Sequence, residues 1–358
     1  MLLMRILVTG GCGFVGFSVA VSLKTIHPNI DIHLLDNLSR KGSELNIHNA
    51  SSYGFTFHHG DVRISSDLIS LPLFDWIVDA SANPSVLAGI RGSDTYSLFE
   101  TNLIGTINIL ELCKKQHAGL ILLSTSRVYS IKKLSSLDII PTNDRFSVSD
   151  KSFESLSGIT QAGITEDFSV KPPISLYGAS KLASETIALE YNFSFDIPLW
   201  INRCGVIAGP GQFARPDQGI FAFWLHSWFE KRSLRYIGFN GSGLQVRDCM
   251  HPYDLATMII KQVNTINSPE REIIQNLSGG AENSMSLREL SAWCTERWGS
   301  LPIISEQEQR PFDLPWVILD SSIAKKQWDW SPQYNINNIL LEISHFAERN
   351  PEWLSKTR

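Results

Sequence analysis

The amino-acid sequence predicts an α/β protein, in which a doubly wound parallel sheet is followed by a smaller C-terminal region. Two observations predict this fold class. Between residues 5 and 203, short apolar runs alternate with helical segments at the spacing of right-handed crossovers. A cluster of glycines directly follows the first apolar run and opens the first helix, as in the first turn of doubly wound sheets.

Each predicted strand is a short apolar run rich in β-branched residues, which is typical of strands buried on both faces. The helical segments repeat apolar residues at helical spacing. The predicted strands cover residues 5–9, 32–35, 55–59, 76–80, 120–124 and 199–203. The predicted helices run from the glycine cluster to residue 23 and cover residues 101–115 and 177–191.

The C-terminal part of the chain lacks this alternation but is rich in tryptophan. The length of 358 residues, at about 150 residues per domain, favours two domains or one large α/β body with an appendage. Six of the ten tryptophans follow residue 290, and aromatic residues mostly pack in cores. We therefore expect a small second core built from these six residues: Trp293, Trp298, Trp316, Trp328, Trp330 and Trp353.

The composition excludes several classes of protein. The formal charge is −5 and no basic stripe appears, which argues against nucleic-acid binding. Apolar residues make up 43% of the chain and charged residues 19%, so a sizeable core can form and disorder is not expected. The longest strongly apolar stretch, residues 220–229, is half the length needed to cross a bilayer.

The five cysteines point to a reducing compartment. They are odd in number, scattered and without a CxxC pair, so neither a disulfide framework nor a metal site is expected. The N-terminal run leads directly into the glycine cluster, which reads as a first strand rather than a signal peptide. We expect a cytoplasmic protein that holds no metal.

The glycine cluster 10–16 predicts a dinucleotide site. Glycines between a strand and a helix allow a tight turn, a close approach of the backbone to a pyrophosphate, and phosphate binding at the helix N-terminus. Asp36 closes the next predicted strand, 20 residues after Gly16, where an acid can accept hydrogen bonds from an adenosine ribose. Such an acid repels a 2′-phosphate, so NAD is favoured over NADP, although Arg40 lies nearby.

A candidate catalytic group begins at Tyr177. Tyr177 and Lys181 lie four residues apart, on one face of a predicted helix. A neighbouring ammonium and a nicotinamide cation would lower the pKa of the phenol and make it available as a base. Thr125, at the end of the fifth predicted strand, could bridge a sugar hydroxyl to Tyr177.

Three motifs together resemble the extended short-chain dehydrogenase/reductases of the NAD-dependent epimerase/dehydratase family. They are TGGCGFVG at residues 9–16, STSRVY at 124–129 and YGASK at 177–181. Segments 36–42, 212–219 and 243–248 are most similar to the CDP-paratose 2-epimerase (CDP-tyvelose epimerase) branch. The resemblance covers nearly the whole chain. It implies a Rossmann-type sheet and an isomerase of nucleotide sugars, acting in polysaccharide biosynthesis by transient oxidation and return of the same hydride.

The resemblance also implies roles for individual residues. Two arginines suit a diphosphate because each can fork onto its oxygens. The expected catalytic residues are Thr125, Tyr177 and Lys181. The expected NAD-binding residues are Gly10, Gly13, Phe14, Val15, Gly16, Asp36, Asn37, Arg40, Asp61, Val62, Ala80, Ser81, Ala82, Asn102, Tyr177 and Lys181. The expected substrate-binding residues are Thr125, Arg203, Gln218, Arg247, Arg310 and Asp313.

The same resemblance predicts the domains and the assembly. Residues 1–205 are expected to form the NAD-binding domain, with 245–265 returning to it, and 206–358 to form mainly the substrate domain. A homodimer or tetramer is expected to form through helices 101–115 and 177–191. Their expected outward apolar residues are Ile107, Leu110, Ala183 and Leu189.

The sequence departs from the family at three places. Val206 stands where many relatives have a substrate-contacting Asn, and Asp79 begins a run that replaces their His-Leu-Ala-Ala. Segment 130–176 is polar, rich in serine and long for the family. A loop of that length is commonly a lid or a disordered insertion. Because its ends adjoin Tyr129 and Tyr177, we expect it to shape the sugar pocket; a surface loop without a catalytic role is the alternative.

Other functions remain open alongside the epimerase. The same fold supports 4-epimerases, reductases and dehydratases of nucleotide sugars. Dehydratases of the family place Asp-Glu directly after the catalytic Thr, whereas this sequence has Ser126 and Arg127 there. A non-catalytic NAD-binding regulator is a further alternative, since fold does not fix function. Such proteins usually lose the Tyr or the Lys, and both are present here.

Overall fold

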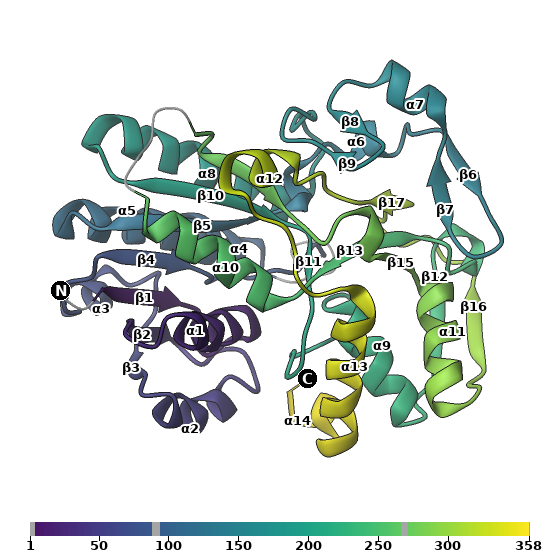
Figure 1. Cartoon of the computed structure of the whole chain (residues 1–358), viewed down its shortest axis with the longest axis horizontal. Helices are drawn as coiled ribbons and strands as arrows, with labels where there is room; N and C mark the ends of the chain where they lie inside the picture. The colour runs from purple at the N-terminus through teal and green to yellow at the C-terminus, as the bar shows by residue number, and fades with distance from the viewer. Residues whose placement is uncertain (1–3, 88–93, 266–270, 358) are drawn as a thin grey trace.

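The computed structural model describes residues 4–87, 94–265 and 271–357, and shows a large sheet flanked by helices with a smaller body beside it (Figure 1). The sheet has seven parallel strands in the order β14-β10-β5-β4-β1-β2-β3. This confirms the predicted doubly wound sheet. The strands are β1 (Arg5–Thr9), β2 (Asp31–Asp36), β3 (Thr56–His59), β4 (Trp76–Asp79), β5 (Gly119–Thr125), β10 (Leu199–Cys204) and β14 (Ile274–Leu277).

Two separate apolar cores cover the two faces of this sheet. One contains side chains of α1 (Phe14–Ile26), α10 (Pro252–Val263) and α12 (Ser322–Trp328). The other contains side chains of α3 (Ser65–Ile69), α5 (Gly105–Gln116) and α8 (Ser175–Phe195). The strand order reverses between β1 and β4, so a ligand crevice is expected at the carboxyl ends of these strands.

The first predicted helix of the second core begins later than its pattern indicated. Residues 101–104 belong to a π-helical turn, η1 (Glu100–Ile104), and α5 follows it. Two further short helices come earlier in the chain than η1: α2 (Glu44–Ser52), between β2 and β3, and α4 (Thr95–Phe99), directly before η1. Leu110 of α5, expected to face outward, is fully buried against the sheet and was assigned to the wrong face.

The smaller body packs its helices around a separate core (Figure 1). Its helices are α9 (Ile220–Phe229), α11 (Leu287–Trp298), α13 (Ile336–Arg349) and α14 (Trp353–Thr357). Its strands are β11 (Val206–Ile207), β12 (Leu234–Ile237), β13 (Val246–Met250), β15 (Ser284–Ser286), β16 (Ile303–Glu306) and β17 (Trp316–Val317). The described residues also contain three 3₁₀ turns: η2 (Ser126–Val128), η3 (Phe239–Gly241) and η4 (Ala281–Asn283).

The tryptophans do not form one second core. Trp293 and Trp298 pack at the edge of the smaller body's core, but Trp328 and Trp330 are buried in the core around α1 and α10. Trp316 packs beneath segment 130–176. The prediction of a single tryptophan core was therefore wrong, because residues 324–330 pack on the large sheet before α13 and α14 rejoin the smaller body.

Segment 130–176 is an ordered appendage rather than a loop. It contains α6 (Ile131–Leu134), β6 (Ile139–Pro141), β7 (Phe146–Val148), α7 (Asp150–Ser155), β8 (Ile159–Thr160) and β9 (Gly163–Ile164). Its backbone bonds to the body of the protein, with Phe146 N donating to Leu244 O and Ile164 N donating to Ile318 O. Its apolar side chains cover the outside of β17. No residue of this segment lines either cavity described below, which argues against a role in shaping the pocket.

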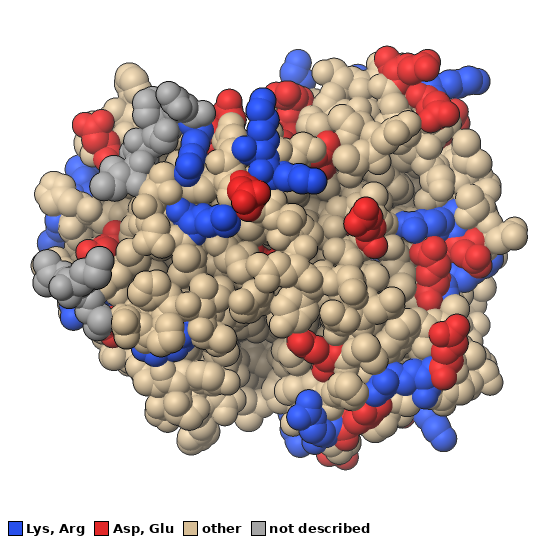
Figure 2. All heavy atoms as spheres, viewed as in Figure 1, with Lys and Arg blue, Asp and Glu red and all other residues tan. Residues whose placement is uncertain are grey.

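The surface seen in Figure 2 carries charged side chains of both signs, scattered mainly towards its edges. No patch of one sign covers this face, in keeping with the absence of a basic stripe in the sequence. None of the described helices is both long and apolar enough to span a bilayer.

A buried histidine makes stability depend on pH. His226 of α9 is 1% exposed, and neither ring nitrogen has a hydrogen-bond partner among the residues that the structure describes. Burial lowers its pKa to about 4, from about 6.5 in the unfolded chain. As the pH falls, His226 is protonated near pH 6.5 in the unfolded state but only near pH 4 in the folded state. Between these values, lowering the pH therefore destabilises the folded state.

We predict that His226→Leu flattens the acid side of the stability profile. The wild-type free energy of unfolding should fall by about 2 kcal/mol between pH 7 and pH 5 through this one group, in addition to any other titration. Urea unfolding at the two pH values measures the difference. The variant should lose less stability than the wild type by that amount; equal losses would contradict the assignment.

Candidate active site

A cavity of about 660 Å³ lies at the carboxyl ends of β1, β4 and β5. It is bounded by the glycine loop, by the ends of β2 and β3, and by residues of the smaller body. The predicted site residues that line it are Gly10, Gly13, Phe14, Val15, Gly16, Asp36, Asn37, Arg40, Asp61, Val62, Ala80, Ser81, Ala82, Thr125, Tyr177 and Gln218.

The glycine loop forms a cradle for an anion. A Cβ on Gly16 would lie 2.3 Å from Gly10 O, so only glycine lets α1 pack on the loop. A Cβ on Gly13 would meet only one protein atom, Gly10 O at 3.1 Å, because its other side faces the cavity. Gly13 is the N-cap of α1 and gives no side-chain cap, so the first helical turn faces the cavity without one. A pyrophosphate suits this site.

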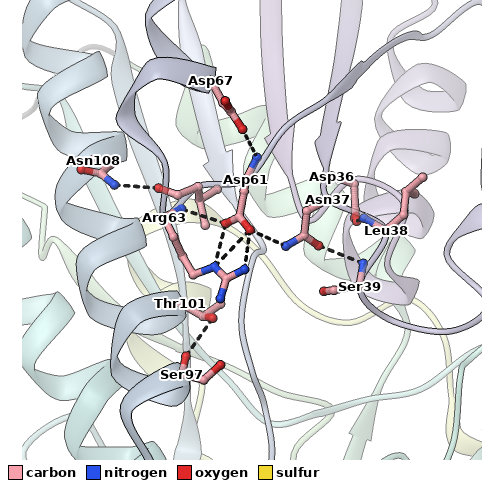
Figure 3. Close-up of polar contacts among 11 residues, drawn as sticks. Asp36, Asn37, Leu38, Ser39, Asp61, Arg63, Asp67, Ser97, Thr101 and Asn108 are labelled. Carbon is pink, nitrogen blue, oxygen red and sulfur yellow. Dashed lines mark hydrogen bonds and ion pairs between the residues drawn. The ribbon is translucent and has the colours of Figure 1, made fainter.

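Acidic side chains mark the far end of the cavity (Figure 3). Asp36 accepts hydrogen bonds from Cys12 N at 3.0 Å and Leu38 N at 2.8 Å, which fixes its carboxylate against the loop. Asp61 binds the guanidinium of Arg63, with Nη2 to Oδ2 at 2.6 Å, and accepts from Asn37 Nδ2 at 2.9 Å. These contacts lower the pKa of Asp61 to about 2. A 2′-phosphate would meet this negative charge, whereas ribose hydroxyls would meet acceptors.

Arg40 does not neutralise these acids. Its Nη2 donates to Phe213 O at 2.6 Å, which ties the loop after β2 to the smaller body. Burial lowers the pKa of Arg40 to about 10. The residue therefore closes one side of the cavity, and the preference for NAD drawn from Asp36 stands.

Two predicted NAD-binding residues lie behind the cavity wall instead of on it. Asn102 is 1% exposed and holds the backbone of Asn83, accepting from its N at 2.8 Å and donating to its O at 3.1 Å. Lys181 is 2% exposed and lines neither cavity. Asn102 can thus position the wall that Asn83 belongs to, although it touches no ligand space.

Asp79 shows what replaces the histidine usual in relatives. It is 1% exposed and accepts from Thr9 Oγ1 at 2.8 Å, Ser81 Oγ at 2.6 Å and Thr106 Oγ1 at 3.2 Å. Its charge also favours the protonated form of Lys181, although burial outweighs this effect and lowers the pKa of that ammonium. The sequence marked Asp79 only as a departure and did not reveal this role.

Thr125 and Tyr177 both line the cavity. The Thr125 hydroxyl lies near enough to the Tyr177 phenol to act on its pKa. A Cβ on Gly178 would lie 2.2 Å from Arg127 O, so glycine is required for α8 to approach η2 this closely. Burial raises the pKa of Tyr177 to about 12, while the Thr125 hydroxyl and the Arg127 guanidinium act in the opposite direction.

Arg127 is a site residue that the sequence reasoning missed. It lines both the large cavity and a second one of about 150 Å³. Burial and the neighbouring Arg247 lower its pKa to about 10. The signal in the sequence was a cation directly after Thr125-Ser126, which we used only to disfavour dehydration.

The second cavity gathers positive charge. Arg247 and Arg310 line it together with Arg127, and Asp217 and Asp313 are the carboxylates among them. Arg247 Nη2 donates to Asp313 Oδ1 at 2.9 Å. Three guanidinium groups against two carboxylates leave an excess of one positive charge, which suits a diphosphate. Gln218 lies on both cavities, so the two form a continuous lining.

Arg203, expected to contact the substrate, is used inside the protein. It is 5% exposed, and its Nη2 donates to Glu185 Oε2 at 2.7 Å, with Nε donating to the same carboxylate. Neither described cavity includes it. Val206, by contrast, lines both cavities and gives an apolar surface where relatives would offer an amide.

Comparison with known families matches residues 6–276 to the model of the NAD dependent epimerase/dehydratase family. Among curated proteins, the chain is 32% identical to the CDP-paratose 2-epimerase of Salmonella typhi, over 92% of this chain and 95% of the relative. It is 25% identical to the UDP-glucuronate 4-epimerase of Thermodesulfobacterium geofontis, over 98% of each chain.

Solved structures share the fold. The UDP-glucose 4-epimerase from Bifidobacterium longum in complex with NAD⁺ and UDP superposes with a TM-score of 0.77 at 20% identity, over 98% of this chain and 100% of that chain. The dTDP-glucose 4,6-dehydratase from Bacillus anthracis in complex with NAD gives a TM-score of 0.74 at 22% identity, over 99% of this chain and 100% of that chain.

We predict that the purified protein releases NAD, and not NADP, on acid denaturation. The cradle at Gly13 and the acids Asp36 and Asp61 motivate this expectation. In Gly13→Leu the added side chain should fill the space left for a pyrophosphate, and the released nucleotide should fall at least tenfold while the circular dichroism spectrum is retained. Release of NADP, or full NAD content in the variant, would count against the site.

Proposed function

Because this chain belongs to the NAD-dependent epimerase/dehydratase family and its cofactor is NAD, we propose that it is a nucleotide-sugar epimerase of the CDP-paratose 2-epimerase type. The observation that carries this proposal is the Thr125–Tyr177 hydroxyl pair, which faces the large cavity where it continues into the arginine-lined one. A sugar attached to a diphosphate could thus reach the hydroxyl pair from its anchored end.

Tyr177 is proposed to carry the proton. It takes a proton from a ring hydroxyl as that carbon is oxidised to a ketone, and it returns the proton when the ketone is reduced. The Thr125 hydroxyl and the Arg127 guanidinium both favour the phenolate form. Bound NAD supplies the hydride acceptor and donor and adds a positive charge beside the phenol.

Lys181 is proposed to act with Tyr177 from behind the cavity wall. Its buried ammonium has the carboxylates of Asp79 and Glu185 close enough to favour its charged form. The charge so held lies one helical turn from Tyr177, where it can stabilise a phenolate.

The arginine-lined cavity is proposed to retain the substrate between the two half-reactions. Arg127, Arg247 and Arg310 can hold the diphosphate while the keto-sugar turns to present its other face. Epimerisation requires this turn, whereas a simple reductase does not. CDP as the nucleotide and carbon 2 as the position are proposed from the 32% identical relative.

Dehydration is a weaker alternative. Elimination of water needs an acid–base pair beside the sugar, and the positions after Thr125 hold Ser126 and Arg127 instead. A reductase or 4-epimerase uses the same hydroxyl pair and differs only in the outcome. A non-catalytic regulator would not need both hydroxyls on the wall of the cavity.

We further propose the division of labour within the chain. Residues 1–205, with 245–265, would hold NAD, and 206–358 would mainly hold the nucleotide sugar. In support, α10 packs against α1 on the large sheet, while most of the arginine-lined cavity belongs to the later residues. Because all five cysteines are buried and free, we propose a reducing, cytoplasmic setting.

A homodimer through α5 and α8 is also part of the proposal. Although Leu110 faces inward, other apolar side chains are exposed on this side: Phe193 is 85% exposed, Ile104 44% and Phe195 45%. Ile107, Ala183 and Leu189 are only partly buried. This amount of exposed apolar surface favours association with a second copy.

For the reaction, we predict that epimerisation in deuterated water leaves the epimerised carbon unlabelled. Internal hydride return brings no solvent hydrogen to that carbon, whereas proton abstraction and return would. Mass spectrometry of the product from a CDP-sugar reads the label. Deuterium at that carbon excludes the mechanism, net consumption of NADH indicates a reductase, and a product lighter by one water indicates a dehydratase.

For Tyr177, we predict that Tyr177→Phe lowers turnover at least about 10²-fold while NAD content stays unchanged. The ring keeps its packing and only the proton carrier is lost. Initial rates on the same CDP-sugar measure the effect. Activity within a few-fold of wild type would remove Tyr177 from the mechanism.

For the assembly, we predict that Phe193→Glu shifts the protein from dimer to monomer at micromolar concentration. The introduced carboxylate would be buried at the interface without a partner, which disfavours the dimer. Light scattering gives the mass, and Ile304→Glu on β16 is the matched control, since it adds the same charge at a 47% exposed residue of the smaller body. A wild-type monomer would refute the dimer.

A further inference from the structure

The arginine-lined cavity has an apolar part that the diphosphate does not use. Phe221 of α9, with Leu287 and Leu290 of α11, lines it. Apolar walls of this kind suit the faces of a planar heteroaromatic ring, and the polar groups among them then meet the ring's edge. The apolar part is only a portion of a cavity of about 150 Å³, so a small ring suits it better than a large one.

Gln245 gives this cavity an acceptor of fixed orientation. The residue lines the cavity and is 8% exposed. Its Nε2 donates to Ile237 O at 3.3 Å. Because a carbonyl oxygen can only accept, the amide nitrogen must face Ile237 and the amide oxygen must be the other end.

The amide oxygen of Gln245 is unpaired. Oε1 is buried and has no hydrogen-bond partner among the residues that the structure describes. A buried acceptor without a partner destabilises a protein, and a ligand in the adjoining cavity can supply the missing donor.

The polar neighbours of Gln245 in the cavity are already engaged. Ser286 Oγ donates to Asp144 O and accepts from Glu289 N at 3.0 Å. Arg247, two residues along β13, pairs with Asp313 and belongs to the cationic part. Gln245 therefore stands out as the group able to read the edge of a ring.

We propose that Gln245 Oε1 accepts a hydrogen bond from the exocyclic amine of a cytosine, and thereby selects cytidine over uridine and thymidine substrates. This inference rests on the proposed function, since it assumes a nucleoside diphosphate sugar in the cavity. Uracil and thymine carry a carbonyl at the same ring position. Two acceptors would then face each other, and Oε1 would stay unpaired in the complex.

The test compares nucleoside diphosphates on the NAD-loaded protein by isothermal titration calorimetry. CDP should bind at least about tenfold more tightly than UDP or dTDP. The diphosphate of pyrimidin-2-one riboside, which is CDP without its amino group, should lose about the same factor. GDP and ADP, which also carry amines, should bind more weakly than CDP because their bases have two rings.

The variant Gln245→Met keeps the side-chain length and removes the acceptor. In this variant the dissociation constants of CDP, UDP and the pyrimidin-2-one analogue should lie within about threefold of one another, even if all three change together. Gln275→Met is the matched control. Gln275 is fully buried, donates from Nε2 to Glu272 O and has an unpaired Oε1, but lines neither cavity. Its CDP preference should stay at the wild-type ratio.

Each outcome decides one claim. If the wild type binds none of these nucleotides, the proposed function fails and this inference fails with it. If nucleotides bind but UDP, GDP or ADP binds best, or if Gln245→Met keeps the CDP preference, the role of Gln245 is overturned while the proposed function stands. If Gln245→Met does not fold, binding of the pyrimidin-2-one analogue to the wild type decides. Equal affinities for that analogue and for CDP overturn the inference.

Discussion

The geometry of the site depends on one buried ion pair, between Glu185 on α8 and Arg203 on β10. Glu185 also accepts from Ser124 Oγ at 2.5 Å, so the carboxylate joins α8 to both β5 and β10. Thr125 follows Ser124 directly, and Tyr177 lies on α8 two turns before Glu185. Removal of one partner would leave a buried charge unpaired, which typically destabilises a protein by about 3–5 kcal/mol. The pair thus fixes the distance between the two hydroxyls.

The two cavities are joined by residues that no single motif contains. Arg127 lies just after β5, whereas Asp217, Gln218 and Gly219 lie in the connection that leads into α9. The large cavity has neutral and acidic walls at its far end, and the smaller one has cationic and apolar walls. Residues of both bodies therefore contribute to one continuous lining.

Local patterns in the sequence were enough for six of the seven strands of the sheet and for the glycine cradle, because strands, tight turns and helix starts are determined by neighbouring residues; β14 was not predicted. They were not enough for Arg203 or Leu110. The partner of Arg203 is Glu185, on an element that only the fold brings near, so the guanidinium looked free for a substrate. Leu110 packs into the core against the large sheet, a contact that only the tertiary structure reveals. Gln245 lies in segment 243–248, which the resemblance includes, but the sequence did not single it out because its role depends on an unpaired atom.

The contact of Arg40 with the carbonyl of Phe213 has a thermodynamic consequence for the order in which ligands arrive. Arg40 borders the dinucleotide cavity, and Phe213 begins a segment whose later residues, from Asp217 to Gly219, border both cavities. If a ligand in one cavity strengthens or loosens this contact, it changes the binding free energy of a ligand in the other cavity. Linkage between two sites is reciprocal, so the second ligand changes the binding free energy of the first by the same amount. A cofactor that stays bound through every turnover would hold this contact in one state and so keep the substrate cavity preorganised.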